Sequence, residues 1–216
     1  MSAEFRRGST LAPSDGRPYA GLVMISSRTA IGFGIAAVTL ELAAGLMYSA
    51  AAGPSSGLSV DPSKLLGSGP TGASLIRWGS LIDMAGYLSI APVVIYLRAR
   101  YSTARYAELY AAAGLALVVI GSIGAVSMAT AAAPLINDYA TAGAVQRQAL
   151  SPAFATLYRA VVLGLWQTLE TIPATVWLLG VASAARREGP QPLFLILVGL
   201  GVVNGAIALY RLIAAS

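Results

Sequence analysis

Five apolar blocks, each long enough to cross a lipid bilayer, constrain this chain more than any other feature of its sequence. A membrane-spanning helix needs roughly 20 apolar residues, and each block exceeds that length. The blocks lack the alternation of polar and apolar residues that a barrel strand requires. We therefore expect an all-α fold, an integral membrane bundle of about five transmembrane helices spanning about residues 29–52, 73–97, 106–133, 153–184 and 191–214.

Composition supports this class and excludes several kinds of chemistry. Charged residues make up 11% of the chain, against about 25% in a typical soluble domain. Cysteine and histidine are both absent, which removes disulfide frameworks, thiolate nucleophiles, Cys/His zinc sites and His-ligated haem. The single lysine, Lys64, lies in a predicted loop, so a Schiff base within a helix is excluded. We expect no metal site and no cofactor.

The arginines predict the orientation of the chain. Basic residues flank the predicted spans at the N-terminus, between the second and third spans, and between the fourth and fifth. For a chain of five spans these three segments fall on one side, which the positive-inside rule makes cytoplasmic. The N-terminus is then inside and the C-terminus outside, in a cell membrane. Because the net charge of +5 is explained by helix ends, we expect no nucleic-acid partner.

The sequence leaves three questions open around the first span: where translation starts, whether the span is cleaved, and what the following loop does. Residues 1–28 have the composition of a disordered cytoplasmic tail, whereas residues 29–214 form the transmembrane domain. Translation could start at Met1 or at Met24. The first span could be a cleaved signal peptide, but it is longer than the usual apolar run and carries Glu41 at its centre. The loop from Gly53 to Gly72 is either a lid or slack.

Three acidic residues lie deep inside the predicted spans. Glu41, Asp83 and Glu170 stand near the centres of the first, second and fourth spans. At a rise of about 1.5 Å per residue, all three should lie within about one helical turn of the bilayer midplane. Each charged side chain at that depth costs at least about 2.5 to 3.5 kcal/mol on insertion scales. Such a residue needs a partner or a function.

Three arginines form a second predicted layer. Arg77, Arg159 and Arg211 each lie eight or nine residues from the centre of their span toward the outside, roughly 12 to 14 Å from the midplane. At that depth they could neutralise the carboxylates or hold an anionic group. This arrangement is the most specific pattern in the sequence.

Helical periodicity adds further candidates to the site. At about 100° per residue, Arg159, Trp166 and Glu170 fall on one line of the fourth span, with Gln167 beside it. Tyr87 shares a face with Asp83, Asn204 lines up with Arg211, and Tyr48 lines up with Glu41. The third span carries no ionisable residue at its centre and is expected to be scaffold. The predicted ligand or proton site comprises Glu41, Asp83, Glu170, Arg77, Arg159, Arg211, Gln167, Asn204, Trp166 and Tyr87.

Three functions remain open for this constellation. The favoured one is a site that binds or conducts a proton, a small cation or an amphiphilic ligand, since carboxylates at the midplane are typical of proton relays. The second is a structural or accessory subunit of a membrane complex, in which an arginine neutralises one acid and the other acids stay protonated. The third is an intramembrane acid-base enzyme acting on a lipid or isoprenoid. The expected partners are the lipid bilayer, a lipid or amphiphile, and a second copy or a larger membrane complex.

Two stretches carry a resemblance to other proteins. They are Leu81-Ile82-Asp83-Met84-Ala85-Gly86-Tyr87, followed by Ala91-Pro92, and Ala153-Phe154-Ala155-Thr156-Leu157-Tyr158-Arg159, followed by Gly164-Leu165-Trp166. Both resemble uncharacterised multi-pass prokaryotic membrane proteins of the domain-of-unknown-function kind. The resemblance covers about a third of the chain and implies an architecture but no activity.

Overall fold

The computed structural model describes residues 25–53, 61–188 and 191–214. Within these ranges the secondary structure is helical, with no strand, as the sequence predicts. The elements are α1 (Ser27–Ala52), α2 (Pro62–Leu66), α3 (Gly69–Arg100), α4 (Ala107–Ser127), η1 (Met128–Ala132), α5 (Ala133–Thr141), α6 (Ala144–Tyr158), η2 (Arg159–Leu169), α7 (Thr171–Glu188) and α8 (Gln191–Ala214), where η1 and η2 are π-helical.

Within the described residues, four helices are long and apolar enough to cross a membrane. They are Ser27–Ala52, Gly69–Arg100, Ala107–Thr141 and Ala144–Arg186. α8 contributes a shorter apolar stretch, Phe194–Ile207, so a fifth span remains a prediction, as do the positions of the termini across the membrane. The chain therefore has the helices of a membrane-embedded protein.

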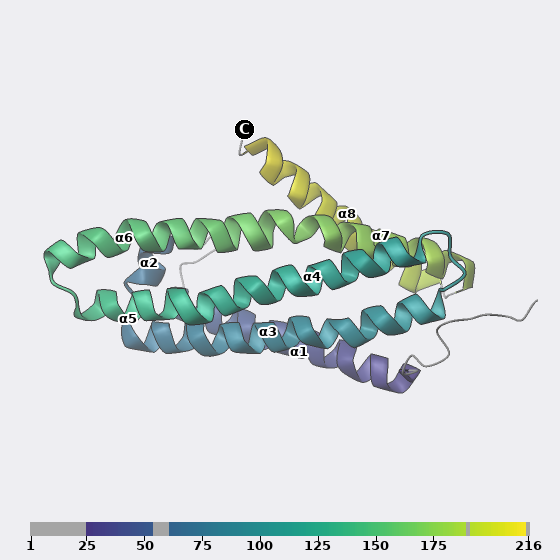
Figure 1. Cartoon of the computed structure of the whole chain (residues 1–216), viewed down its shortest axis with the longest axis horizontal. Helices are drawn as coiled ribbons and strands as arrows, with labels where there is room; N and C mark the ends of the chain where they lie inside the picture. Colours follow the sequence, from purple (N-terminus) through teal and green to yellow (C-terminus); the bar gives the residue numbers. More distant parts are fainter. Residues whose placement is uncertain (1–24, 54–60, 189–190, 215–216) are drawn as a thin grey trace, which may run out of the picture.

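The long helices lie side by side in a row (Figure 1). α1 packs along α3, α3 along α4, α4 along α7 and η2, and α7 along α8. α1 makes little contact with η2 or α7, so the two ends of the row are not closed against each other. Figure 1 also shows that α8 turns back from the end of α7 and diverges from the bundle toward the C-terminus.

Small residues at a spacing of seven bring α1 and α3 together. Ala30, Ala37, Ala44 and Ala51 are the regularly spaced buried residues of α1, and they face Gly72, Gly79 and Gly86 of the antiparallel α3. A carbonyl oxygen of α1 lies only 3.6 Å from where a Cβ of Gly79 would stand. Small residues allow backbones to approach this closely in lipid, and a seven-residue repeat keeps one face in contact along both helices.

Glycines elsewhere in the bundle receive aromatic rings. A Cβ on Gly121 of α4 would meet the Tyr87 ring at 2.2 Å, and one on Gly124 would meet the Trp166 indole at 2.3 Å. Gly114 holds Trp177 in the same way, at 3.0 Å. The scaffold role expected for the third span is consistent with these contacts, because α4 provides the sockets in which the aromatic side chains of α3, η2 and α7 are placed.

The α5–α6 end of the molecule differs from the predicted spans. Residues 134–152 were expected to be a loop, but α5 and α6 continue the third and fourth spans as helices of 35 and 43 residues. At about 1.5 Å per residue these helices are about 52 and 64 Å long, which exceeds the roughly 30 Å apolar layer of a bilayer. Part of each helix therefore extends beyond the apolar layer, and polar residues such as Asp138 and Arg147 favour the α5–α6 end as that part.

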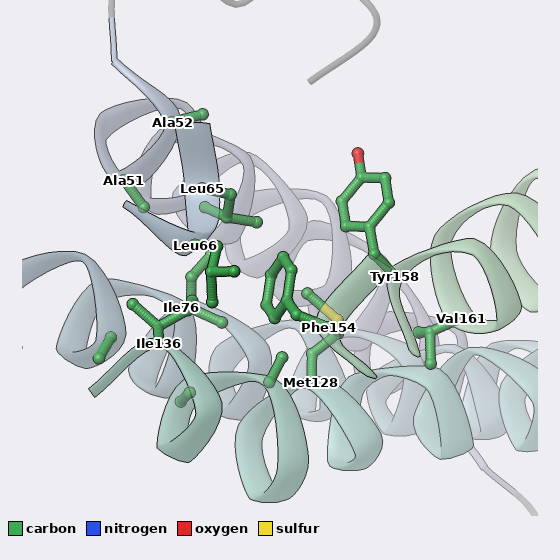
Figure 2. Packing of buried hydrophobic residues seen from close by; sticks show 13 residues of the cluster. Ala51, Ala52, Leu65, Leu66, Ile76, Met128, Ile136, Phe154, Tyr158 and Val161 are labelled. Atoms are coloured by element: carbon green, nitrogen blue, oxygen red, sulfur yellow. The ribbon is translucent and has the colours of Figure 1, made fainter. Parts of the chain in front are cut away.

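A hydrophobic cluster stabilises this end. Leu65 and Leu66 of α2 and Phe154 of α6 meet Ile76 of α3 and Ile136 of α5, and all five are almost fully buried (Figure 2). The guanidinium of Arg147 closes the α5–α6 hairpin by donating hydrogen bonds to the carbonyl oxygens of Tyr139 (3.1 Å) and Ala140 (3.2 Å). The region predicted to connect the first and second spans therefore includes α2, which docks onto this cluster.

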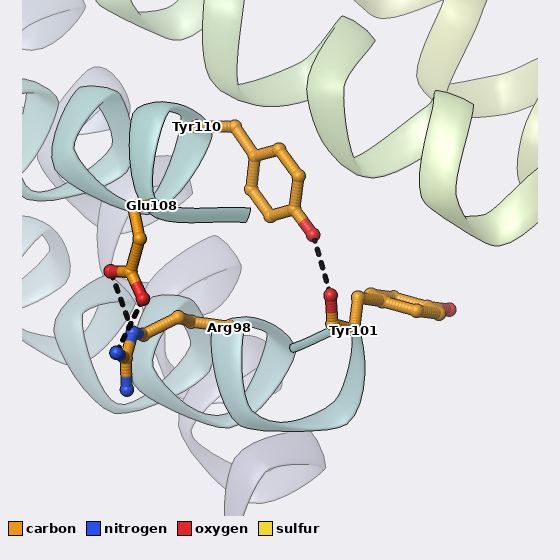
Figure 3. A network of polar contacts seen from close by, with 4 residues as sticks. All are labelled: Arg98, Tyr101, Glu108 and Tyr110. Atoms are coloured by element: carbon orange, nitrogen blue, oxygen red, sulfur yellow. Dashed lines mark hydrogen bonds and ion pairs between the residues drawn. The ribbon is translucent and has the colours of Figure 1, made fainter. Parts of the chain in front are cut away.

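The opposite end is fastened at the turn between α3 and α4. Arg98 donates to both carboxylate oxygens of Glu108, with 3.0 Å from Nε to Oε2, and the Tyr110 hydroxyl donates to the Tyr101 carbonyl at 3.3 Å (Figure 3). The Arg98 guanidinium thus has a structural role here, as the partner of Glu108 in an ion pair. An exposed pair of this kind contributes only about 0 to 1 kcal/mol, so burial of the Tyr110 ring contributes more to the turn.

Some expectations lie outside the described residues. These are the tail up to residue 24, with the choice between Met1 and Met24, and residues 54–60 of the loop proposed as a lid. The side chain of Arg211 is also outside the described part.

The aromatic sockets predict a specific sensitivity to added volume. Gly121→Ala should destabilise the protein by about 1 to 3 kcal/mol, because the Tyr87 ring must shift in a packed interior. Gly45→Ala on α1 is the matched control, since its Cβ would meet nothing within 4 Å. Thermal unfolding of the two variants in one detergent measures the difference. Equal midpoints would contradict the socket geometry.

Candidate functional site

The three acids predicted near the bilayer midplane come from three different helical segments and lie near one another. Glu41 lies on α1, Asp83 on α3, and Glu170 at the junction of η2 and α7. The carboxyl groups of Glu41 and Asp83 lie close enough to interact strongly, and Glu170 lies within electrostatic range of both. A direct hydrogen bond between two carboxyl groups requires a proton on one of them, so these two acids can bond only when one of them is protonated.

A glycine makes room for the carboxyl pair. Gly86 lies one turn of helix beyond Asp83 on α3, and a Cβ there would stand 2.7 Å from Oε1 of Glu41. The same oxygen is buried and accepts no hydrogen bond from any described residue. The Glu41 carboxyl is therefore packed against bare backbone with one oxygen unpaired. An unpaired buried acceptor costs about 1 to 3 kcal/mol, so this position is open to a proton or another donor.

Two tyrosine hydroxyls contact the acids. Tyr87 donates to the carboxylate of Glu170, at 2.8 Å from Oε1 and 2.9 Å from Oε2. Tyr48 donates to Oγ of Ser80 at 3.0 Å and lies 3.4 Å from Oδ2 of Asp83. Since a hydroxyl can both donate and accept, Tyr48 links Asp83 to a neighbouring hydroxyl, and the polar groups form two short chains rather than isolated contacts.

A π-helical segment sets the direction of the fourth span's polar residues. Over η2 the backbone bonds run to the fifth residue back, as in the 2.8 Å bond from the Glu170 amide to the Leu165 carbonyl. Pro173 lacks an amide hydrogen and its ring crowds the carbonyl four residues earlier, which favours such a change of register just before it. Wide turns of this kind often occur at functional sites.

The change of register separates residues that the sequence placed on one line. Each residue of a π-helix turns through a smaller angle than in an α-helix, so the assumed 100° does not apply through η2. Trp166 and Glu170 face into the bundle, whereas Arg159 is exposed. The Trp166 indole donates to the Gly121 carbonyl at 3.3 Å and packs edge-on against Tyr48, with 6.0 Å between ring centroids.

The predicted arginine layer does not meet the acids in the described part of the chain. Arg77 and Arg159 are both exposed, and neither pairs with a carboxylate of the cluster. Arg77 lies instead in a surface hollow beside Asn137 and Asp138 of the α5 end. Asn204 bonds its own helix, donating to the Leu200 carbonyl at 2.9 Å. These positions separate the arginines and Asn204 from the carboxyl cluster.

Three participants were not among the predicted site residues. Tyr48, Ser80 and Gly86 complete the polar cluster, and each lies close to a predicted acid along its own helix face. Tyr48 follows Glu41 by seven residues, while Ser80 and Gly86 flank Asp83 by three on either side. Spacings of three and seven around a buried acid were therefore the available signal, since residues at these intervals share a helix face.

A cavity adjoins the cluster on the side of the α5–α6 end. It measures about 160 Å³ and lies among α1, α2, α3, η1 and the α6–η2 helix. Tyr48, Trp166 and Gln167 line it together with apolar side chains. Oε1 of Gln167 is buried and has no hydrogen-bond partner among the described residues. The predicted residues Trp166 and Gln167 thus line a cavity, which Tyr48 connects to Asp83.

Comparison with protein-family models, with curated proteins and with solved structures finds no match for this chain. The resemblance of the Asp83 and Arg159 stretches to multi-pass prokaryotic proteins therefore stays an interpretation of the sequence.

The Tyr87–Glu170 contact predicts a measurable coupling. In a double-mutant cycle of Tyr87→Phe and Glu170→Leu, the interaction energy should be about 1 to 3 kcal/mol, because each single change leaves a buried partner without its hydrogen bond. The cycle is built from the unfolding free energies of the wild type, the two single variants and the double variant in one detergent. Tyr106→Phe, on an exposed ring, combined with Glu170→Leu is the control and should give additive effects. Additivity at Tyr87 as well would show that the hydroxyl does not hold Glu170.

Proposed function

We propose that this chain is a multi-pass membrane protein whose intramembrane carboxyl cluster binds protons and passes them between Glu41, Asp83 and Glu170. The observation that carries the proposal is the Glu41–Asp83 pair, two acids on neighbouring helices whose carboxyl groups interact strongly and have no arginine beside them in the described chain. Two acids that share one proton can take up a second or release the first. Intramembrane acids in this arrangement are typical of proton pathways.

Hydroxyl groups beside the acids support transfer as well as binding. Tyr48 stands between Asp83 and Ser80, and Tyr87 holds Glu170. A tyrosine hydroxyl can receive a proton on its oxygen while giving up its own. The pair of tyrosines thus offers relays at both ends of α3's polar face, which carries Ser80, Asp83 and Tyr87.

The geometry favours a proton over a metal cation. Among the residues that the structure describes, no three acidic side chains converge closely enough to coordinate one metal ion. A cation in hydrocarbon would need several oxygen ligands at once, whereas a proton needs only two oxygens. Because Arg77 and Arg159 lie apart from the acids, an anionic ligand held between the two layers has less support than a proton.

A structural role is the second candidate, and one observation favours it. The Tyr87 ring fills the Gly121 socket and its hydroxyl bonds both oxygens of Glu170. This contact alone could fix the rotation of α3 against α4 and η2. Buried polar groups can specify packing in this way without chemistry. A purely structural role does not explain why Oε1 of Glu41 is buried without a hydrogen-bond partner in the described chain. We therefore rank proton binding first.

The orientation in a cell membrane is part of the proposal. Arg28, the α3–α4 turn with Arg98, and Arg186 lie at the same end of the molecule, where α1 begins and α7 ends (Figure 1). Basic residues gathered at one end support a cytoplasmic location for that end. The α5–α6 end then projects to the outside, and a fifth span formed by α8 would carry the C-terminus there.

Proton flux into liposomes tests the proposal. Protein reconstituted around a trapped pH-sensitive dye should acidify the interior faster than empty liposomes after an acid pulse, with potassium and valinomycin to collapse the potential. Asp83→Asn and Glu41→Gln should each slow this flux at least about tenfold, since removing a relay group typically costs 10²–10⁴-fold in proton-transfer steps. Asp138→Asn, an exposed acid on α5, should leave it unchanged.

Carbodiimide labelling provides a second readout. A hydrophobic carbodiimide reacts with protonated acids inside a membrane, and mass spectrometry should locate it on Glu41 or Asp83. Labelling without flux would limit the function to proton binding. Neither labelling nor flux above the level of empty liposomes would leave the structural role as the better account.

A further inference from the structure

We propose that the cavity between α1 and the α6–η2 helix is a binding site for a small uncharged amphiphile that carries one hydroxyl group, such as a phenol or a short alcohol dissolved in the bilayer. This inference goes beyond proton binding and does not depend on it.

The volume fits one small ring. The cavity measures about 160 Å³, and an engineered apolar cavity of about 150 Å³ is large enough to hold benzene. A phospholipid or a sterol is several times too large to enter completely. A single metal ion or one water would leave most of the space empty. The volume therefore selects molecules of about the size of a phenol.

The wall excludes a chain of water molecules. At about 30 Å³ per molecule the cavity would hold about five waters, each of which needs two to four polar partners. Leu65, Ile76, Met128 and Val162 supply none, and the Trp166 indole hydrogen is already bonded to Gly121. Apolar contact across most of the wall favours an apolar body instead.

The aromatic side chains of the wall add to this preference. Tyr158 contributes its ring, while its hydroxyl points away from the apolar cluster (Figure 2). Tyr48 and Trp166 meet edge-on at the boundary of the cavity. Rings of this kind stack on or meet the edge of another ring with a gain of about 0.5 to 1.5 kcal/mol per pair. An aromatic body is therefore better suited to the wall than a branched alkane.

One polar group of the wall lacks a partner. Oε1 of Gln167 is buried and accepts no hydrogen bond in the described chain, and its side chain lines the cavity. Rotation about the last side-chain bond turns either the oxygen or the amide nitrogen toward the cavity. A ligand hydroxyl would donate to that oxygen and remove the cost of leaving it unpaired, about 1 to 3 kcal/mol. Among the described residues no charged side chain lines the cavity, so a charged ligand would lose its hydration without compensation.

The cavity lies between helices that are not closely packed along their backbones. α1 packs along α3 but makes only slight backbone contact with η2, and the Tyr48 and Trp166 side chains meet between them. The wall of the cavity includes Tyr48, whose hydroxyl lies 3.4 Å from Asp83. The proposed amphiphile would enter from the bilayer between α1 and the α6–η2 helix and bind beside the carboxyl cluster.

Fluorine NMR of the full-length protein in detergent micelles tests this site. The probes are 4-fluorophenol and 4-fluorotoluene, which differ by a hydroxyl in place of a methyl group. Wild-type protein should bind 4-fluorophenol saturably and at least about tenfold more tightly than 4-fluorotoluene. Gln167→Leu should remove that preference, because the acceptor is gone while the apolar wall remains.

Two substitutions of the same size separate the cavity from the micelle. Val162→Phe places a ring in the cavity and should abolish saturable binding, whereas Val119→Phe on an exposed face of α4 should leave it intact. Both variants are measured in the same micelles. The signal from probe that is merely dissolved in the detergent is therefore the same for both and does not affect the comparison. Saturation transfer from the ring protons of 4-fluorophenol to the Trp166 indole, assigned by its loss in Trp166→Phe, locates the probe even if Val162→Phe fails to fold.

The outcomes are distinct from those for proton binding. Saturable binding that survives in Glu41→Gln and Asp83→Asn would support the amphiphile site whether or not these variants lose proton flux. Binding that is absent in the wild type, equal for the two probes, or unchanged in Gln167→Leu would overturn it. Equal loss in Val162→Phe and Val119→Phe would also overturn it, because the effect would not come from the cavity.

Discussion

The close approach of α1 and α3 is the contact on which the rest of the structure depends. Helices in lipid gain nothing from hiding apolar surface, so they associate only where their surfaces fit closely. The alanines of α1 and the glycines of α3, both repeating at seven residues, provide that fit. It also leaves space at Gly86 for the carboxyl of Glu41, which then lies beside Asp83. The α1–α3 interface thus determines both the packing of these helices and the placement of the polar groups.

The second level of organisation is the placement of aromatic rings in glycine sockets. α4 carries no ionisable residue at its centre, but its glycines hold Tyr87, Trp166 and Trp177 against its backbone. Each ring is fixed by packing, and the polar end of the ring is directed as a result. The Tyr87 hydroxyl reaches Glu170, and the Trp166 indole reaches a carbonyl of α4. A helix that looks inert in sequence therefore positions two of the polar groups of the site.

The π-helical segment links the site to the cavity. A change of register before Pro173 turns Glu170 toward Tyr87 and keeps Trp166 and Gln167 on the side of α1. With regular α-helical winding, Arg159 would share this face; with π winding it lies at the surface. The removal of the arginine from the cluster is what makes proton sharing between Glu41 and Asp83 the better account of the acids.

The sequence by itself determined that the chain is helical, that it has segments able to cross a membrane, and that three acids lie near the middle of those segments. These properties depend on local composition and length, because the cost of placing a polar group in hydrocarbon is set by its position along its own helix. The small-residue spacings that bring α1 and α3 together are also present in the sequence.

Only the tertiary structure decided which groups meet. The partners of Glu41 and Glu170, the exposure of Arg77 and Arg159, and the cavity beside Gln167 all depend on the rotation of one helix against another. The π-helical winding of η2 changed that rotation, so the assumption of 100° per residue did not apply through this segment. The helix ends also differ from those predicted from the sequence. α5 and α6 are stabilised by a hydrophobic cluster that forms only when α2, α3 and α6 are packed together. Contacts between distant segments, unlike burial in a bilayer, are not encoded at any one position of the chain.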